Sequence, residues 1–239
     1  MVRGAVTVAA VVGLGAGLGA CAVSGGPGSA GSGGAPAQVR AVADTEGLSG
    51  VPVRVKGAVV VVGEKDAPHT VKVYEDARCP FCKRFEEGGA RALVGPVADG
   101  DVKVEYTIAS FLDRNLGGAG SERAANALRA SVDAGKFPEF HAALFANQPE
   151  DESDDVFTNA FLLRIADRVE GLRGPAFDRA VRDGSHEAWV RDAMQAFRED
   201  GMRGTPTVLI DGHKAGGGED AMYGEASFAG VLRKAGIGS

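Results

Sequence analysis

The chain of 239 residues is poor in cysteine and has three, at positions 21, 79 and 82. It also lacks a basic stripe, and its net charge of −6 does not fit the electrostatic footprint of a nucleic-acid-binding protein. The apolar segment 5–18 has 14 residues and is too short to span a bilayer comfortably. The histidines show no metal-ligand spacing, so we expect neither a metal site nor a cofactor. They are His69, His141, His186 and His213.

The N-terminus has the pattern of an export signal. A short positive start precedes the apolar segment, which has the length of a signal-peptide core. The segment ends in Leu18-Gly19-Ala20-Cys21, which resembles the bacterial lipoprotein box. That resemblance implies that residues 1–20 are removed, that Cys21 is lipidated, and that the protein lies outside the cytoplasm, anchored to the cell membrane. The alternative is an ordinary cleaved signal with a bystander cysteine.

The next segment, 21–37, consists almost entirely of Gly, Ser, Ala and Pro from residue 24 onward. This composition is typical of a flexible tether, with a reach on the order of 20 Å for about 14 residues. The composition changes near residue 38, so we expect one folded domain over 38–239.

Two cysteines stand where a predicted strand passes into a predicted helix. The apolar stretch 71–75 favours a strand, and a helical pattern with Phe81, Phe85, Leu93 and Val94 follows. Cys79 then falls at the helix N-cap, Pro80 at the first helical position and Cys82 on the first turn. Unpaired N–H groups and the helix dipole favour a thiolate at that end.

From this placement we expect Cys79 to be an exposed nucleophile with a lowered pKa and Cys82 to be the buried resolving thiol. Positive charge from Arg78, Lys83 and Arg84 should favour the thiolate further. The carboxylates of Glu75 and Asp76 partly oppose it. One interpretation of these two acids is a proton relay to Cys82. The favoured one is that they stand at a strand end and a turn, so the predicted site does not include them.

The rest of the domain reads as strands around a block of helices. Strands are predicted at 51–56, 58–62, 102–108 and 207–210, and a last helix at 225–234. Because a strand, a helix and a strand follow in order, the strands around the cysteine helix should be parallel.

Start and stop signals predict five helices between residues 121 and 200, within an insertion at about 113–200. The acidic run 150–155 is interpreted as a solvated loop leading into a helix. Large aromatic residues in this region are expected in the core: Phe140, Phe157, Phe161, Phe177, Trp189 and Phe197.

The motif at 79–82, the helical block and Thr205-Pro206 together resemble the DsbA-like thiol–disulfide oxidoreductases. The resemblance implies an α/β thioredoxin fold, a central mixed sheet with flanking helices, carrying a helical insertion. It implies that Cys79 forms the mixed disulfide, and that the Thr205 backbone pairs with a bound peptide beside a cis Pro206. Phe81 departs from the best-known oxidase, which has His there.

The predicted activity is therefore thiol–disulfide exchange with cysteine-containing exported proteins. Export favours the oxidase direction. No further cysteine pair is present, so a separate redox partner must recharge the disulfide. The alternatives are a disulfide reductase of the same fold, and a non-catalytic chaperone or binding lipoprotein. Two non-catalytic roles of the cysteine pair are also open. The pair could supply two of the four ligands of a zinc site, or it could form a purely structural disulfide.

Overall fold

The computed structural model describes residues 1–2, 39–40, 46–218 and 220–238. The predicted signal peptide, the tether and Cys21 lie outside the described residues. Among the described helices, none is both long and apolar enough to cross a bilayer.

The core of the domain is one mixed sheet of six strands in the order β1-β2-β4-β3-β5-β6. The central strands β3 and β4 are parallel and the other pairs are antiparallel. The predicted parallel pair around the cysteine helix is therefore confirmed. The strands are β1 (Val53–Lys56), β2 (Val59–Val62), β3 (His69–Asp76), β4 (Val102–Ala109), β5 (Thr207–Ile210) and β6 (His213–Lys214).

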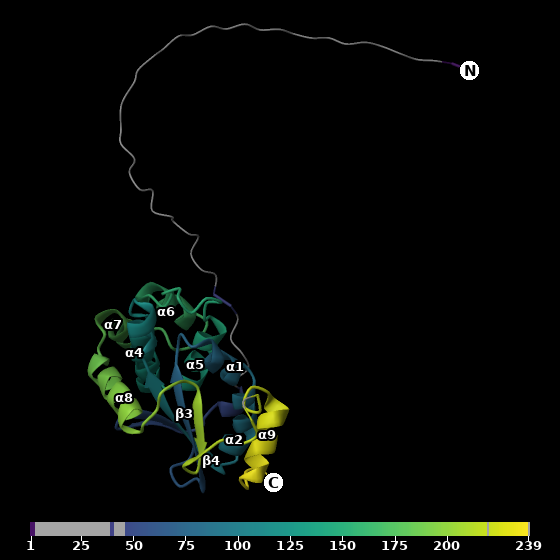
Figure 1. Ribbon diagram of the computed structural model, residues 1–239. Coiled ribbons are helices and arrows are strands. Elements are labelled where there is room, and N and C mark those ends of the chain that lie inside the picture. Colours follow the sequence, from purple (N-terminus) through teal and green to yellow (C-terminus); the bar gives the residue numbers. More distant parts are fainter. Residues whose placement is uncertain (3–38, 41–45, 219, 239) are drawn as a thin grey trace. The chain divides into compact units, whose positions relative to one another are not determined.

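Helices cover both faces of this sheet (Figure 1), with α2 and α9 on one side and α4 and α8 on the other. The helices are α1 (Pro80–Glu87), α2 (Val94–Ala98), α3 (Leu112–Leu116), α4 (Gly120–Asp133), α5 (Phe137–Ala146), α6 (Asn159–Ala166), α7 (Pro175–Asp183), α8 (Glu187–Glu199) and α9 (Glu225–Lys234). Short 3-10 turns lie at Glu46–Leu48 and Gly89–Leu93.

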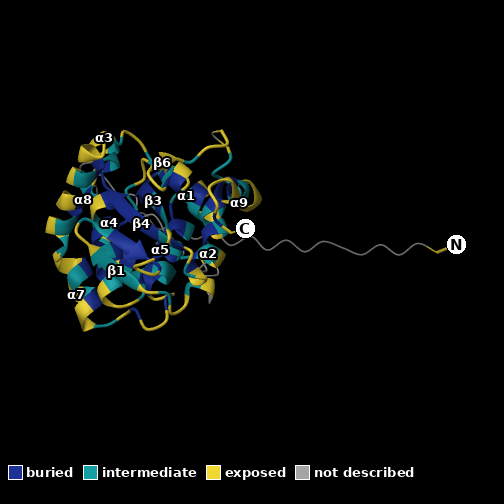
Figure 2. Ribbon diagram, turned by 90° about the horizontal axis from the view of Figure 1, so that it is seen from below, coloured by how far each residue is buried: buried dark blue, intermediate teal, exposed yellow. Residues whose placement is uncertain are grey.

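Apolar residues of β3 and β4 form the centre of the core, and Figure 2 shows both strands as largely buried. Of the six aromatic residues expected inside, five are buried. The exception is Trp189, which is half-buried and donates its Nε1–H to the carbonyl of Gly57 at 3.0 Å. An indole can bury its apolar ring in this way while its N–H finds a partner.

The single helix predicted after the cysteines is wrong in extent, because the segment divides into α1, the turn Gly89–Leu93 and α2. The cause is a close approach of two backbones. A Cβ on Gly88 or Gly89 would collide with the carbonyl oxygens of Tyr223 and Met222. Two glycines permit this contact, and they weaken the helix at the same point.

The helical insertion lies between β4 and β5, as predicted, and α4, α7 and α8 end within two residues of Gly135, Gly184 and Gly201. Two starts differ. The sequence predicts Ser121 as a helix cap, but α4 begins at Gly120, and the Ser121 hydroxyl instead donates to Asp76 Oδ1 at 2.6 Å. The spacing of Phe157, Phe161 and Ile165 predicts a helix that includes Phe157, but α6 begins only at Asn159, after the N-cap Thr158. The acidic run therefore stops short of that helix.

Candidate active site

The two cysteines lie where β3 passes into α1. The backbone N–H of Cys79 donates to the Asp76 carbonyl at 3.0 Å, and the Cys79 carbonyl accepts from Cys82 N–H at 3.1 Å. Cys79 is the N-cap of α1 and Pro80 stands at its first position. Both cysteines are free thiols. The prediction that Cys79 is exposed is wrong: contact with the segment before β5 buries it, at 6% exposed against 0% for Cys82.

Cys79 is held against the segment before β5. Its Sγ lies 3.2 Å from the carbonyl oxygen of Thr205, and the Thr205–Pro206 peptide bond is cis. Thr205 also has a buried hydroxyl with no hydrogen-bond partner among the described residues. The carbonyl can accept from the protonated thiol, whereas the hydroxyl can donate to the thiolate.

The hydrogen bond from the Cys82 thiol is the largest cause that lowers the pKa of Cys79, to about 6. Burial opposes this shift, while the Thr205 side chain and the N–H groups of Cys82 and Phe81 contribute in the same direction. These donors surround the sulfur at the start of a helix, where an anion is stabilised. At neutral pH Cys79 is thus mainly a thiolate.

Cys82 has the opposite character. Burial raises its pKa well above the ordinary range of a thiol, and the charges of Cys79 and Glu75 add to the effect. A thiol of this kind is held protonated until a base accepts its proton. The two sulfurs of one motif are therefore differentiated into a thiolate and a thiol.

A buried cluster of titratable groups, Glu75, Glu86 and His141, lies behind the cysteines. His141 Nε2 lies 2.6 Å from Glu75 Oε1, and its Nδ1 lies 3.7 Å from Glu86 Oε2. Burial raises the pKa of each carboxyl group to about 8, and burial lowers the pKa of the imidazole. One oxygen of each carboxyl group has no partner among the described residues. The three side chains can therefore share and exchange a proton near neutral pH.

This cluster is not predicted from the sequence, which places Glu75 outside the site and shows no ligand spacing for His141. Their donor atoms, with one of Glu86, lie within 4.8 Å of one another. Among the described residues, these three side chains could together hold a metal ion. However, His141 Nε2 and Glu75 Oε1, two of the possible ligand atoms, are already hydrogen-bonded to each other. The arrangement fits a hydrogen-bonded chain better than a coordination sphere.

Gln148 is a further residue that the sequence interpretation missed. From the end of α5, its Nε2 donates to the carbonyl of Ala77 at 2.7 Å and to that of Cys79 at 2.9 Å. The side chain is 2% exposed. It therefore fixes both ends of the short loop that carries the nucleophile.

The positive charges expected to favour the thiolate are engaged elsewhere. Arg78 is 1% exposed, and its guanidinium contacts Asp113 Oδ1 at 2.9 Å and the Gly117 carbonyl at 2.6 Å. It also donates to the carbonyls of Glu152 and Ser153 in the acidic run. Arg78 thus connects the active-site loop to the helical insertion, and burial at this depth requires that it be paired.

Asp76, the residue at the end of β3, makes a second connection. Its carboxylate accepts from Arg78 N–H at 3.0 Å, Ser121 Oγ at 2.6 Å and Leu112 N–H at 3.1 Å. Burial raises the pKa of Asp76 to about 7, against these three donors. The group positions the loop and the first helices of the insertion relative to each other.

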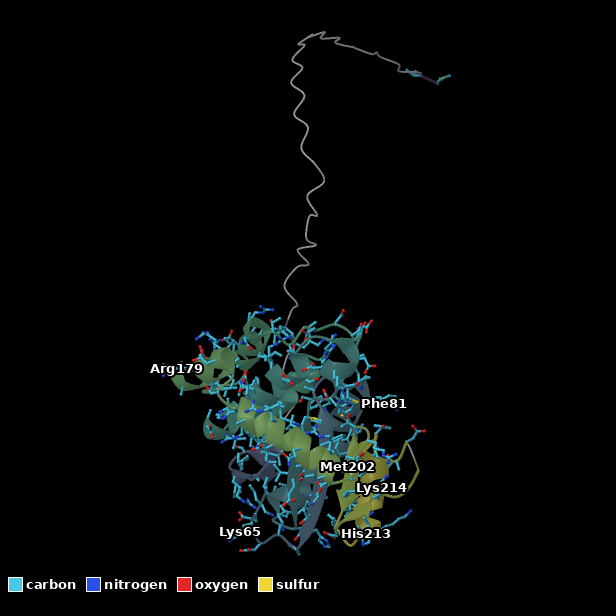
Figure 3. The ribbon with its side chains drawn as sticks, turned by 60° about the vertical axis from the view of Figure 1, so that its left-hand side comes forward. Lys65, Phe81, Arg179, Met202, His213 and Lys214 are labelled. Carbon is cyan, nitrogen blue, oxygen red and sulfur yellow. The ribbon has the colours of Figure 1, made fainter. Side chains whose placement is uncertain are left out.

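The outer rim of the site is aromatic. Phe81 is 50% exposed, and its ring centroid lies 6.3 Å from that of Tyr223. The guanidinium of Arg84 lies 4.3 Å above the Tyr223 ring, a cation–π contact. Figure 3 shows Phe81 projecting from the surface. This rim is an apolar contact surface beside the nucleophile.

The comparisons with known proteins agree with this geometry. Residues 56–223 match the family described as thioredoxin. Disulfide bond formation protein D of Bacillus subtilis is 28% identical over 169 residues, which are 70% of this chain and 72% of that protein. The Na(+)/H(+) antiporter NhaA 3 of Salinispora tropica is 29% identical over 158 residues, 64% of this chain but 22% of the antiporter. The chain thus spans about a fifth of that relative's length.

Among solved structures, reduced DsbA of Mycobacterium tuberculosis has 27% sequence identity and a TM-score of 0.60 to this chain. The match covers 75% of this chain and 93% of that one. The predicted mixed sheet with flanking helices and a helical insertion is therefore confirmed as a fold.

Proposed function

This chain belongs to the thioredoxin family, and from that premise we propose that it exchanges thiols and disulfides with polypeptides through Cys79 and Cys82. The difference between the two sulfurs carries the proposal. One is a thiolate at a helix start with a pKa of about 6, and the other is a buried thiol with a raised pKa. Metal binding and a purely structural role would require no such difference.

In the oxidising direction, a substrate thiolate attacks Cys79 Sγ of the 79–82 disulfide. A mixed disulfide forms, and Cys82 leaves and takes up a proton. A second substrate thiolate then attacks the substrate sulfur of the mixed disulfide and releases the Cys79 thiolate. The substrate loses two electrons and the enzyme pair gains them, so a redox partner must later remove them. The reductase reaction is the same sequence reversed.

We propose that the buried cluster of Glu75, Glu86 and His141 supplies the proton that Cys82 takes up and accepts it in the reverse reaction. The charge of Glu75 acts directly on Cys82, and Glu75 is hydrogen-bonded to His141, which faces Glu86 on its other nitrogen. A carboxyl group whose pKa is raised to about 8 can both give and accept a proton at neutral pH. Glu75 is the proton carrier in this scheme, and His141 and Glu86 set its protonation.

The oxidase direction is supported by the same contacts. Groups that stabilise the Cys79 thiolate stabilise the reduced pair, and a stabilised reduced form makes the disulfide a stronger oxidant. We further propose that the rim formed by Phe81 and Tyr223 contacts the substrate, and that Thr205 pairs with its backbone beside Pro206.

The proposed location is outside the cytoplasm, at the membrane, and the proposed substrates are cysteine-containing exported proteins. The lipoprotein-like segment ending at Cys21 supports this placement. Expression of the full chain with Cys21→Ser should move the protein from the membrane fraction to the soluble fraction. Unchanged fractionation would contradict lipid anchoring without affecting the proposed chemistry.

Trapping of the mixed disulfide tests the activity. With a reduced cysteine-containing test protein and an oxidant, Cys82→Ser should accumulate a covalent complex through Cys79, and Cys79→Ser should not. Turnover by the unaltered chain, compared with Cys79→Ser, separates enzyme from chaperone. Equal rates of disulfide formation would refute the enzyme proposal in favour of a non-catalytic binding protein.

A further inference from the structure

A cleft of about 1020 Å³ lies beside the active site, between α8 and the segments that follow β4. Apolar side chains line the half that contains residues 110–115 and 194–203: Phe111, Met194, Phe197 and Met202. The rings of Phe111 and Phe197 are stacked, with centroids 5.5 Å apart. The cleft is thus a formed recess with an apolar lining, in the size range of ligand sites. We call the half lined by residues 110–115 and 194–203 the Arg198 cleft.

The Arg198 cleft adjoins the segment that leads to Thr205. Met202 and Arg203 line it, and Thr205 follows two residues later, a distance of at most about 7 Å along the chain. The Thr205 carbonyl is the group 3.2 Å from Cys79 Sγ. A polypeptide joined to Cys79 and lying over Thr205 therefore reaches the cleft within a few residues of its cysteine.

The charge of the Arg198 cleft is of one sign. Arg114, Arg198 and Arg203 line it, all three are exposed, and none has a side-chain hydrogen bond or ion pair within the described part of the chain. The rest of the lining carries both signs of charge, with four carboxylates and three arginines: Glu122, Asp183, Glu187, Asp192, Arg123, Arg182 and Arg191.

Two acidic residues adjoin Arg198 in sequence, but neither lines the cleft. Glu199 accepts from Gln195 Nε2 at 2.7 Å, and Asp200 accepts from the Tyr74 hydroxyl at 2.7 Å. Three arginines therefore line the recess with no ion pair among the described residues, although the whole chain carries a charge of −6.

We propose that the Arg198 cleft binds the stretch of a substrate polypeptide next to its reacting cysteine and selects stretches that combine apolar with acidic side chains. This inference rests on the proposed function. Guanidinium groups around an apolar recess match carboxylates carried on an extended apolar segment. A polypeptide is favoured over an anionic membrane surface because the arginines border a recess whose lining ends two residues before Thr205, the residue in contact with Cys79.

The test compares two reduced peptides that differ only in three residues beside the cysteine, Asp-Leu-Asp against Lys-Leu-Lys, and a third with Ser-Leu-Ser. We expect kcat/KM to be on the order of tenfold higher for the acidic peptide than for the lysine peptide at low salt, and the ratio to fall with added salt. Arg198→Glu with Arg203→Glu should reverse the preference. The matched control is Arg179→Glu, which changes an exposed arginine on α7 that does not line the cleft and lies far from Met202 in Figure 3. This variant should retain the preference for the acidic peptide.

The outcomes separate this inference from the proposed function. No turnover of any peptide by the unaltered chain refutes the function itself. Turnover with equal rates for the three peptides, or a preference that survives the double reversal, overturns the inference alone. Equal peptide rates together with binding to phosphatidylglycerol vesicles that the double reversal abolishes would assign the arginines to a membrane surface instead.

Discussion

Cys79 Sγ and the carbonyl oxygen of Thr205 lie 3.2 Å apart although 126 residues separate them in the sequence. Strand β5, which begins at Thr207 and pairs with β3, creates this contact by bringing the residues before it over the start of α1. The nucleophile, the helix start and the proposed peptide-pairing segment therefore form one unit.

The Thr205 hydroxyl is predicted to hold the pKa of Cys79 down. Thr205→Val keeps the shape of the side chain and removes a donor to the thiolate, so the pKa of Cys79 should rise by about 1 unit. The pH dependence of iodoacetamide alkylation at Cys79, followed by mass spectrometry, measures this. Thr207→Val is the matched control, because the Thr207 hydroxyl donates to Gly204 and not to the sulfur. An unchanged alkylation midpoint in Thr205→Val would assign the low pKa to other donors.

Glu75 is predicted to make the domain less stable as the pH rises. Its pKa is raised from an ordinary 4.5 to about 8, so the folded chain retains a proton that the unfolded chain releases. The stabilisation is complete below about pH 4.5 and is lost as the pH rises through about 8.

Glu75→Gln removes this titration. From pH 5 to pH 8 the unaltered chain should lose roughly 1 kcal/mol or more in free energy of unfolding that the variant does not lose. Urea unfolding at both pH values measures the change. Glu87→Gln, an exposed carboxyl on the same helix α1 as Glu86, should leave the profile unchanged. Parallel profiles for Glu75→Gln and the unaltered chain would show that Glu75 is already ionised at pH 5.

Gln148 is predicted to hold the active-site loop in place. Gln148→Leu removes the donor shared by the carbonyls of Ala77 and Cys79. The Cys79 carbonyl keeps the N–H groups of Cys82 and Lys83 as donors, so the Ala77 carbonyl is the group that loses its partner. The cost should be about 1–3 kcal/mol in the free energy of unfolding, the range for one buried carbonyl left without a partner. Gln195→Leu serves as control, since its amide pairs with Glu199 on the exposed face of α8. A loss below about 0.5 kcal/mol would mean that water replaces the amide.

Local patterns in the sequence were sufficient for most of the fold. Pro138 marks the start of α5, and Pro175 and Gly184 mark the two ends of α7. Apolar alternation marks β4, and the parallel pair follows from the order of elements. The segment after Cys82 was misjudged because its helical period continues across Gly88. What ends the helix there is contact with residues 222–223, and that contact is not visible in local sequence.

The site was predictable only as far as its residues are close in sequence. The motif and its helix start lie within a few residues of one another. His141 and Gln148 lie on or just after α5, and only the packing of α5 against α1 brings them to the cysteines. Arg78 was assigned by proximity in sequence to the thiolate, but its side chain turns to Asp113, because a fully buried guanidinium needs partners that the helical insertion supplies.

The equilibrium between the 79–82 pair and glutathione tests the central claim most directly. After equilibration in buffers of graded glutathione ratio, acid quenching and alkylation, mass spectrometry gives the fraction of the 79–82 disulfide. We predict one two-electron transition at a potential less negative than about −200 mV, because the Cys79 thiolate is stabilised. Failure of Cys79 and Cys82 to form a disulfide with each other at any ratio would contradict the account.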